Sequence, residues 1–421
     1  MKILFVNKFL YPNGGSETYI FELGKELIRM GNQVEYFGME HEGRIVGNHA
    51  ESYTADMDFH SGKLQKLLYP FKILYSTEAR KKIRLVLNDF APDVVHINNI
   101  NYQITPSILY EIRKYEKQTG RNVKIIATAH DYQWVCPNHM MYIPQKEEIC
   151  DRCLGGHFGE CTKNSCIHSS KVKSLLGTVE SLYYHGRKTY ALFDTVICPS
   201  SFLKEQLKTD PVLKDKLLVM HNFVSGKQEK AAGTNEQQDI SKQQGTRINN
   251  QHHTEPYVLY FGRYAKEKGI ETLLLTCEKL PDIPFVFAGN GPLEELVNKA
   301  RNIQNRGFLS GEALKELIQG AVCTIYPSEW YENCPFSVME SQMYGTPVIG
   351  ADIGGIPELI VDGKTGLLFK SRDLDDLKDK IEMLWNNHAL CEELYEGCSE
   401  NSFDDVTTYC EKLLHVYEEK K

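Results

Sequence analysis

Apolar runs alternate with amphipathic helical patterns along the first half of the chain. Residues 2–7 form an apolar run typical of a buried strand. Residues 17–30 then repeat apolar side chains at helical spacing, with Ser16 placed to cap the start of the helix and Gly31 to end it. Strands separated by helices in this way predict a parallel sheet with helices on both faces.

The alternation is interrupted once and then restarts. Further strands are predicted before the interruption at 33–37, 93–97, 123–129, 195–199 and 217–220, and after it at 257–261, 285–288, 306–309, 322–326 and 347–350. Residues 225–255 are rich in Gln, Asn, Lys and Gly and predict a flexible linker. We therefore expect an α/β protein with domains at 1–224 and 256–400. Residues 401–421 are expected to form a helix that could pack back on the N-terminal domain.

Composition narrows the class of protein and its location. The chain has 421 residues, of which 42% are hydrophobic and 25% charged, as in ordinary globular proteins. A net charge of −8 disfavours a nucleic-acid binder, which would need a basic face. The sequence contains neither a signal peptide nor an apolar run of about 20 residues. A cytoplasmic protein with reduced cysteines is therefore expected.

Two positive charges follow the predicted strand 257–261. Arg263 and Lys268 lie five residues apart, after Gly262 and before the next predicted helix. A guanidinium fork and an ammonium group together suit a diphosphate. The alternative is a solvated basic loop.

Two glutamates lie seven residues apart around the start of another predicted helix. Glu332 precedes the helix and Glu340 lies on it. A carboxylate at the second position can accept two hydrogen bonds from a ribose diol, and the free amides at the helix start can bind an anion. The alternative is a pair of surface glutamates on an amphipathic helix.

Glycine pairs and a histidine mark further strand ends. Gly14-Gly15 follows the first strand, but the turn is not a GxGxxG dinucleotide fingerprint. Gly354-Gly355 follows strand 347–350. Such glycine pairs either let the backbone approach a ligand closely or serve as plain turns. His130 directly follows strand 123–129, and at this strand end it either faces a ligand or is a buried structural histidine.

In this order the elements resemble the family 4 glycosyltransferases of the GT-B fold. The motifs that carry the resemblance are Gly14-Gly15, Gly262-Arg263 with Lys268-Gly269, Glu332 with Glu340, and Gly354-Gly355 with Glu358. The resemblance covers nearly the whole chain apart from the linker and a cysteine-rich insert at 136–168. It implies two doubly wound, Rossmann-like domains facing across a cleft, with the acceptor on the N-terminal side and the nucleotide sugar on the C-terminal side.

The resemblance also implies a reaction. The chain would be a retaining hexosyltransferase that needs no catalytic metal and uses a nucleotide-diphosphate sugar, with UDP- or GDP-sugars as the leading donors. Its acceptor would be a hydroxyl of a glycan or lipid-linked glycan, as in bacterial surface-polysaccharide or glycolipid synthesis. Two alternatives stay open: a nucleotide-sugar epimerase of the same fold, and a catalytically silent scaffold whose cysteine insert binds a zinc ion and a partner.

Roles for individual residues follow from the same resemblance. Arg263 and Lys268 would neutralise the diphosphate, Glu332 would contact the transferred sugar, and Glu340 would hold the ribose hydroxyls. His130 would contact the donor sugar from the acceptor side. The remaining donor contacts implied are Gly14, Gly15 and the backbone amides of Phe336, Ser337 and Val338.

Two segments lie outside these motifs. Cys150, Cys153, Cys161 and Cys166 form a C-x2-C-x7-C-x4-C pattern that predicts a structural zinc site, with free or redox-active thiols as the alternative. Lys63–Arg84 interleaves basic and apolar residues, a pattern that could rest on the inner face of an anionic membrane as a peripheral contact. The alternative is a helix packed on its own domain.

Overall fold

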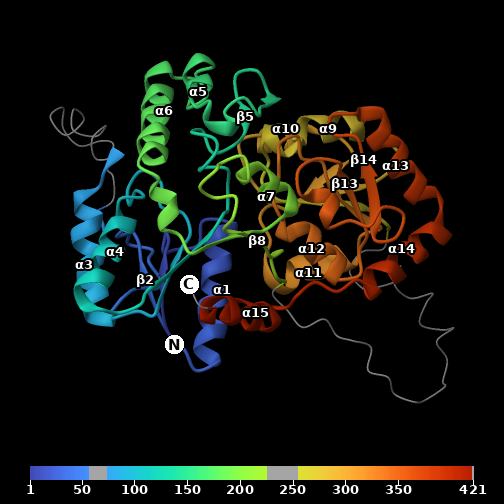
Figure 1. Ribbon diagram of the computed structural model, residues 1–421. Helices are drawn as coiled ribbons and strands as arrows, with labels where there is room; N and C mark the ends of the chain where they lie inside the picture. Colours follow the sequence, from blue (N-terminus) through green and yellow to red (C-terminus); the bar gives the residue numbers. More distant parts are fainter. Residues whose placement is uncertain (56–73, 225–254, 420–421) are drawn as a thin grey trace, which may run out of the picture. The chain divides into compact units, whose positions relative to one another are not determined.

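The computed structural model describes residues 1–55, 74–224 and 255–419 (Figure 1). The chain divides into two compact units, the first formed by residues 1–222 with 406–421 and the second by 223–405. The predicted linker 225–255 lies outside the described residues except for Glu255.

The first unit is built on a six-stranded parallel sheet in the order β2-β1-β3-β4-β7-β8. Its strands are β1 (Lys2–Val6), β2 (Gln33–Phe37), β3 (Val94–Ile97), β4 (Lys124–Thr128), β7 (Thr195–Cys198) and β8 (Leu217–Val219). The longer helices of this unit are α1 (Gly15–Arg29), α3 (Thr77–Phe90), α4 (Ile108–Thr119), α6 (Lys171–Gly186), α7 (Ser201–Leu207) and α15 (Val406–Glu418). Every residue of β3 and β4 is buried, as expected for central strands covered on both faces.

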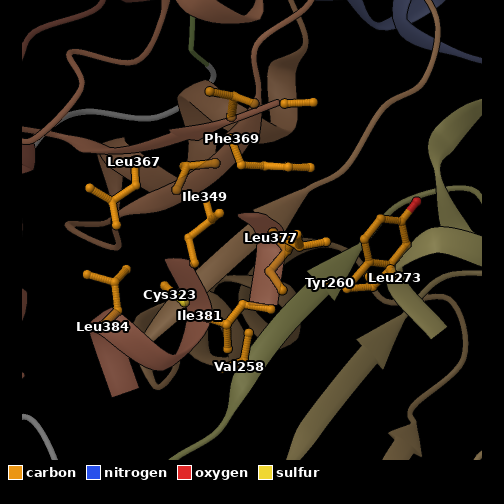
Figure 2. Close-up of a cluster of buried hydrophobic side chains, with 14 of the residues drawn as sticks. Val258, Tyr260, Leu273, Cys323, Ile349, Leu367, Phe369, Leu377, Ile381 and Leu384 are labelled. Carbon is orange, nitrogen blue, oxygen red and sulfur yellow. The ribbon is translucent and has the colours of Figure 1, made fainter. Parts of the chain in front are cut away.

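The second unit repeats this plan with the strand order β11-β10-β9-β12-β13-β14. Its strands are β9 (Val258–Phe261), β10 (Phe285–Ala288), β11 (Ile303–Asn305), β12 (Cys323–Tyr326), β13 (Val348–Ala351) and β14 (Gly366–Phe369). Its helices are α9 (Ile270–Glu278), α10 (Glu294–Lys299), α11 (Gly311–Gln319), α12 (Phe336–Met343), α13 (Leu374–Asn386) and α14 (His388–Glu400). Figure 2 shows side chains of α13, such as Leu377 and Ile381, in one buried cluster with Val258, Ile349 and Phe369 of the sheet.

The two parallel sheets confirm the predicted α/β fold class, but one strand was misplaced. Residues 306–309 were expected to be a strand, whereas β11 ends at Asn305. The chain turns immediately afterwards, because Gly307 has a φ of 67° and Phe308 is 70% exposed. Strand β14 was not predicted, because its first residue, Gly366, is a poor strand former.

The C-terminal helix α15 belongs to the first unit. Tyr409 Oη lies 3.0 Å from Tyr19 Oη of α1, and Tyr417 Oη lies 2.5 Å from His96 Nδ1 of β3. The other ring nitrogen of His96 lies 2.7 Å from Thr128 Oγ1 of β4. Burial lowers the pKa of His96 to about 3, so this imidazole is neutral at physiological pH. A buried chain of polar contacts therefore ties α15 to the sheet.

The described part of the basic segment Lys63–Arg84 packs on its own unit. Residues 63–73 lie outside the described residues, and the rest enters α3. Arg80 and Arg84 each lie 2.6 Å from the Glu111 carboxylate on α4. These two cations are therefore engaged within the unit.

Candidate functional site

Each sheet has one point where the strand order reverses. The chain leaves β9 toward β10 on one side, and β12 lies on the other side of β9. In open α/β sheets, ligands bind beyond the carboxyl ends of the strands at such a point. The loop with Arg263 and Lys268 follows β9, and the loop with Glu332 follows β12. The topology therefore brings these two predicted motifs to one place in the second unit.

The two motifs meet in a direct ion pair. Lys268 Nζ lies 2.5 Å from Glu332 Oε1. The same oxygen accepts hydrogen bonds from Trp330 Nε1 at 2.6 Å and from Ser328 Oγ at 2.9 Å. The Lys268 ammonium also lies 5.2 Å from the centre of the Trp330 ring, within the range of a cation–π contact. Lys268 is thus fixed by a carboxylate and an indole together.

Glu332 is held in its ionised form. Burial alone would raise the pKa of its carboxyl, but the charge of Lys268 and the donated hydrogen bonds lower the pKa below its usual range. The carboxylate is nearly buried, with 11% of the side chain exposed, whereas 22% of Lys268 is exposed. The pair therefore presents the cation, more than the anion, to a ligand.

Glycines allow the loops around this pair to approach one another. Gly269 has a φ of 73°, and a Cβ there would lie 1.8 Å from the carbonyl oxygen of Pro327. Gly354 has a φ of 62°, and a Cβ there would lie 2.5 Å from the carbonyl oxygen of Glu332. The amide of Gly355 donates to that same carbonyl at 2.7 Å. The structure thus places the predicted Gly354-Gly355 pair against the backbone of the Glu332 loop.

Arg263 lies in the same loop as Lys268 but contacts a different carboxylate. Its side chain is 64% exposed, and Nη1 lies 3.9 Å from Glu267 Oε1. The preceding Gly262 has a φ of 144°, which a larger residue rarely adopts. The backbone carbonyl of Arg263 accepts a hydrogen bond from Tyr260 Oη at 2.9 Å. The guanidinium is therefore accessible, and only weakly engaged by Glu267.

One loop beside Arg263 was missed by the sequence analysis. The amide of Tyr264 donates to Asn290 O at 2.8 Å, and a Cβ on Gly289 would lie 1.9 Å from Gly262 O. Gly291 has a φ of 153° and leaves equally little room against Tyr264. The signal available in the sequence was a Gly-x-Gly directly after the predicted strand 285–288.

Helix α12 carries the second glutamate. Glu340 is half-buried, and burial raises the pKa of its carboxyl to about 7. The helix begins after Pro335 without a side-chain cap, which leaves the amides of Phe336, Ser337 and Val338 in its first turn. Within the described residues, the structure does not place Glu340 in contact with Lys268 or Glu332.

In the first unit, the Gly14-Gly15 turn opens α1. Gly14 is the N-cap residue in an extended conformation, and both glycines are exposed. The prediction that Ser16 caps this helix was wrong, because Ser16 already lies inside the first turn. Its hydroxyl instead donates to Glu17 Oε1 at 2.9 Å and accepts from Asn99 Nδ2 at 2.9 Å. These bonds tie the start of α1 to the loop after β3.

His130 follows β4 at the same edge of the first sheet. Its Nε2 lies 2.8 Å from Asn98 Oδ1, and its ring meets the Tyr19 ring edge-on with centroids 5.1 Å apart. Burial lowers the pKa of this histidine to about 4, so the ring is neutral at pH 7. A neutral, fixed imidazole can donate or accept a hydrogen bond but carries no charge to a ligand. The predicted site residues thus form two groups, one in each unit.

The cysteine insert forms a small apolar cluster of its own. Cys153, Cys161 and Cys166 are buried together, and Cys150 packs against them. Cys136, which the predicted zinc set omitted, hydrogen-bonds with Cys153, and this bond lowers the pKa of the Cys136 thiol to about 7. Across the described ranges, no group of three or more His, Cys, Asp or Glu side chains is positioned to hold a metal ion. Zinc therefore stays a prediction, which a metal analysis of the purified protein would test.

Curated relatives resemble parts of the chain. A sulfoquinovosyl transferase from Arabidopsis thaliana is 30% identical over 168 residues, covering 38% of this chain and 33% of the relative. An alpha-D-kanosaminyltransferase from Streptomyces kanamyceticus is 32% identical over 156 residues, covering 34% of this chain and 40% of the relative. The chain thus spans only a third to two fifths of the length of these two relatives.

Solved structures resemble the chain over its full length. The Anabaena protein Alr3699/HepE in complex with UDP has a TM-score of 0.61 at 16% identity, covering 99% of each chain. This likeness shows the GT-B fold alone. The family profiles are more specific: residues 241–404 match glycosyl transferases group 1, and residues 13–226, about half of the chain, match glycosyltransferase family 4. This protein belongs to glycosyltransferase family 4.

Proposed function

We propose that this chain is a retaining glycosyltransferase that moves a hexose from a nucleotide-diphosphate sugar to a hydroxyl of a glycan or lipid-linked glycan. The observation that carries the proposal is the Lys268–Glu332 pair at the switch point of the second sheet. An exposed guanidinium, Arg263, lies in the same loop, five residues away. Family membership and the UDP bound by the Anabaena neighbour support a nucleotide-sugar donor.

Lys268 and Arg263 would stabilise the leaving diphosphate. As the bond between sugar and phosphate breaks, negative charge develops on the leaving group, and preorganised cations lower the energy of that state. Lys268 is already fixed by Glu332 and Trp330, so it needs little reorganisation. Arg263 is free to move onto a ligand because Glu267 lies 3.9 Å away. We propose that these side chains fill the role that a metal ion fills in other transferases.

Glu332 and the first unit would act on the sugar. With Oε1 occupied by Lys268, Ser328 and Trp330, the second carboxylate oxygen of Glu332 is the atom proposed to contact the donor sugar. His130 would contact that sugar as a neutral hydrogen-bonding group, because burial keeps its pKa near 4. Gly14 and Gly15 would let the α1 turn approach the phosphates without side chains in the way. We propose UDP- or GDP-sugars as the donors.

A thermal-shift screen tests this function first. Purified protein is heated with UDP-, GDP-, ADP- and TDP-sugars, each with and without EDTA. One nucleotide class should raise the melting temperature, because a ligand that binds only the folded state stabilises it by mass action. The shift should persist in EDTA if side chains alone hold the diphosphate. No shift with any nucleotide, in protein shown to be folded, would contradict the proposal.

Retention is tested separately, by NMR analysis of the anomeric configuration of the product.

Glu340 is expected to make donor binding depend on pH. If its carboxylate accepts hydrogen bonds from the ribose diol, protonation removes that acceptor, and the pKa of about 7 places the change near neutrality. Donor affinity should therefore be roughly tenfold lower at pH 6 than at pH 8. Calorimetric titration with the donor identified above measures this, since its diphosphate does not titrate in that range.

Two variants make the pH test specific. Glu340→Gln should bind the donor weakly and with little pH dependence, whereas Glu312→Gln, an exposed position on α11, should behave like the parent protein. A parent pH profile that Glu340→Gln reproduces in full would remove Glu340 from the donor site.

A further inference from the structure

Helix α6 exposes its apolar side chains and buries its small ones. Four aliphatic residues on it are exposed: Val172 at 78%, Leu175 at 52%, Val179 at 41% and Leu182 at 54%. The residues that it buries are Ser174, Gly177, Thr178, Ser181 and Tyr184. A surface helix ordinarily places its apolar stripe toward the core. In α6 this arrangement is reversed.

The reversal is fixed by contacts of the inner face. Thr178 Oγ1 donates to Phe158 O at 3.0 Å, and Ser174 Oγ accepts from Ile167 N at 2.9 Å. A Cβ on Gly177 would lie 2.5 Å from Ile167 Cδ1. These contacts bind α6 to the cysteine insert, including α5 (Gly159–Lys163), which packs beside it (Figure 1). A rotation of the helix that turned its leucines inward would therefore break these contacts.

The exposed aliphatic residues form one continuous stripe. Positions 172, 175, 179 and 182 follow helical spacing and extend for about 15 Å along the axis at 1.5 Å per residue. Leu176 and Tyr183, both half-buried, continue the same side. The stripe thus carries only aliphatic and aromatic side chains over almost three turns.

Positive charges border this stripe. Lys171 and Lys173 are exposed at the N-terminal end of α6, and Arg187 and Lys188 are exposed just beyond its C-terminal end. The one acidic residue of the helix, Glu180, is half-buried, and burial raises the pKa of its carboxyl to about 8. The exposed face of the helix therefore carries cations at both ends although the whole chain has a net charge of −8.

The size and composition of the stripe favour lipid over a protein surface. Stable protein interfaces use about 20–30 residues on each side and are enriched in aromatic residues and arginine at their centres. This stripe is one helix wide and mostly valine and leucine. An aliphatic face bordered by Lys and Arg is the pattern of a helix that lies in a membrane interface. No helix of the described ranges is long and apolar enough to cross a bilayer, so such contact would be peripheral.

We propose that α6 docks on an anionic membrane surface, with Val172, Leu175, Val179 and Leu182 in the interface and the flanking cations on lipid headgroups. This docking would place the first unit at a lipid surface. It does not depend on the proposed transferase activity and can be tested without a donor or an acceptor.

Vesicle flotation tests the docking. The full chain is mixed with phosphatidylglycerol–phosphatidylcholine vesicles or with phosphatidylcholine alone, and the floated fraction is measured. The parent should float with the anionic vesicles, and added salt should weaken binding by screening the cations. Leu175→Glu combined with Leu182→Glu should reduce the partition coefficient about tenfold or more, because two leucines would no longer enter the apolar layer.

A matched control separates the stripe from general surface hydrophobicity. Ile28→Glu combined with Leu85→Glu changes two other exposed helical positions of the same unit, at 54% and 53% exposure, and should float like the parent. The proposal is overturned if the parent stays unbound with anionic vesicles, or if the Leu175/Leu182 variant floats equally well. Sedimentation that shows a dimer dissociated by the same variant, without vesicle binding, would assign the stripe to a second copy instead.

Discussion

Replacing Lys268 with alanine is expected to lower kcat by about a hundredfold or more while changing donor affinity less. The lysine ammonium is the fixed cation of the proposed site, held 2.5 Å from Glu332 Oε1 and close to the Trp330 indole. Its proposed interaction strengthens as charge develops on the leaving diphosphate, so its loss should act mainly on turnover. Steady-state kinetics with the donor identified by thermal shift measure this.

Nearby variants distinguish catalysis from general charge. Lys266→Ala removes a more exposed cation of the same loop, which contacts Glu271 at 3.3 Å, and should leave kcat within a few-fold of the parent. Arg263→Ala should resemble Lys268→Ala in depressing turnover. The double variant Lys268→Ala with Glu332→Gln should have a higher free energy of unfolding than Lys268→Ala alone. The single change leaves the buried Glu332 carboxylate without its cation. A near-parental kcat for both Lys268→Ala and Arg263→Ala would contradict the proposed roles.

The sheets could be predicted from the sequence because their signal is local. Each central strand is a short apolar run followed by a helical pattern, so β1, β4 and β10 were predicted within one residue of their ends. The exception at 306–309 arose where a polar strand, β11, meets a glycine turn, and periodicity is weakest there. The fold class follows from the alternation alone, whereas errors arise in strands whose apolar pattern is weak or interrupted by glycine, such as β11 and β14.

The candidate site was only partly predictable, because its contacts join distant parts of the chain. Lys268 and Glu332 were each singled out, but their pairing across 64 positions depends on β9 and β12 being neighbours in the sheet. Trp330 and Ser328 were not predicted as site residues, since a lone tryptophan or serine in a loop has no distinctive spacing. For Gly354 the sequence left close approach to a ligand and a plain turn both open, and the structure places this glycine against the Glu332 backbone.

Helix α6 illustrates the same limit from another side. Its apolar positions at helical spacing would ordinarily indicate the buried face of a helix. Only the three-dimensional contacts of Ser174 and Thr178 with the cysteine insert show that the small residues face inward. From the sequence, the candidate segment for membrane contact was Lys63–Arg84. In the structure, Arg80 and Arg84 of that segment form ion pairs with Glu111.

Replacing Tyr409 with alanine is expected to lower the free energy of unfolding of the first unit by about 3–5 kcal/mol. The Tyr409 side chain on α15 is 1% exposed and meets the Tyr19 ring edge-on, with centroids 5.9 Å apart. Truncation removes a large aromatic group between α1 and α15. It also removes the hydroxyl contact that Tyr409 makes with Tyr19 Oη, while the contact of Tyr19 Oη with Thr128 at 3.1 Å remains. Urea unfolding followed by circular dichroism measures the loss.

Two further variants divide this effect into its parts. Tyr409→Phe removes only the hydroxyl contact and should lower the unfolding free energy by about 1 kcal/mol. Glu411→Ala, an exposed position on the same helix, should change it by less than about 0.5 kcal/mol. If α15 is a structural part of the first unit, only the unfolding transition of that unit should move in these variants. Equal losses in the alanine and phenylalanine variants would show instead that the ring contributes little packing, and that the buried hydroxyl contacts alone hold the helix to the sheet.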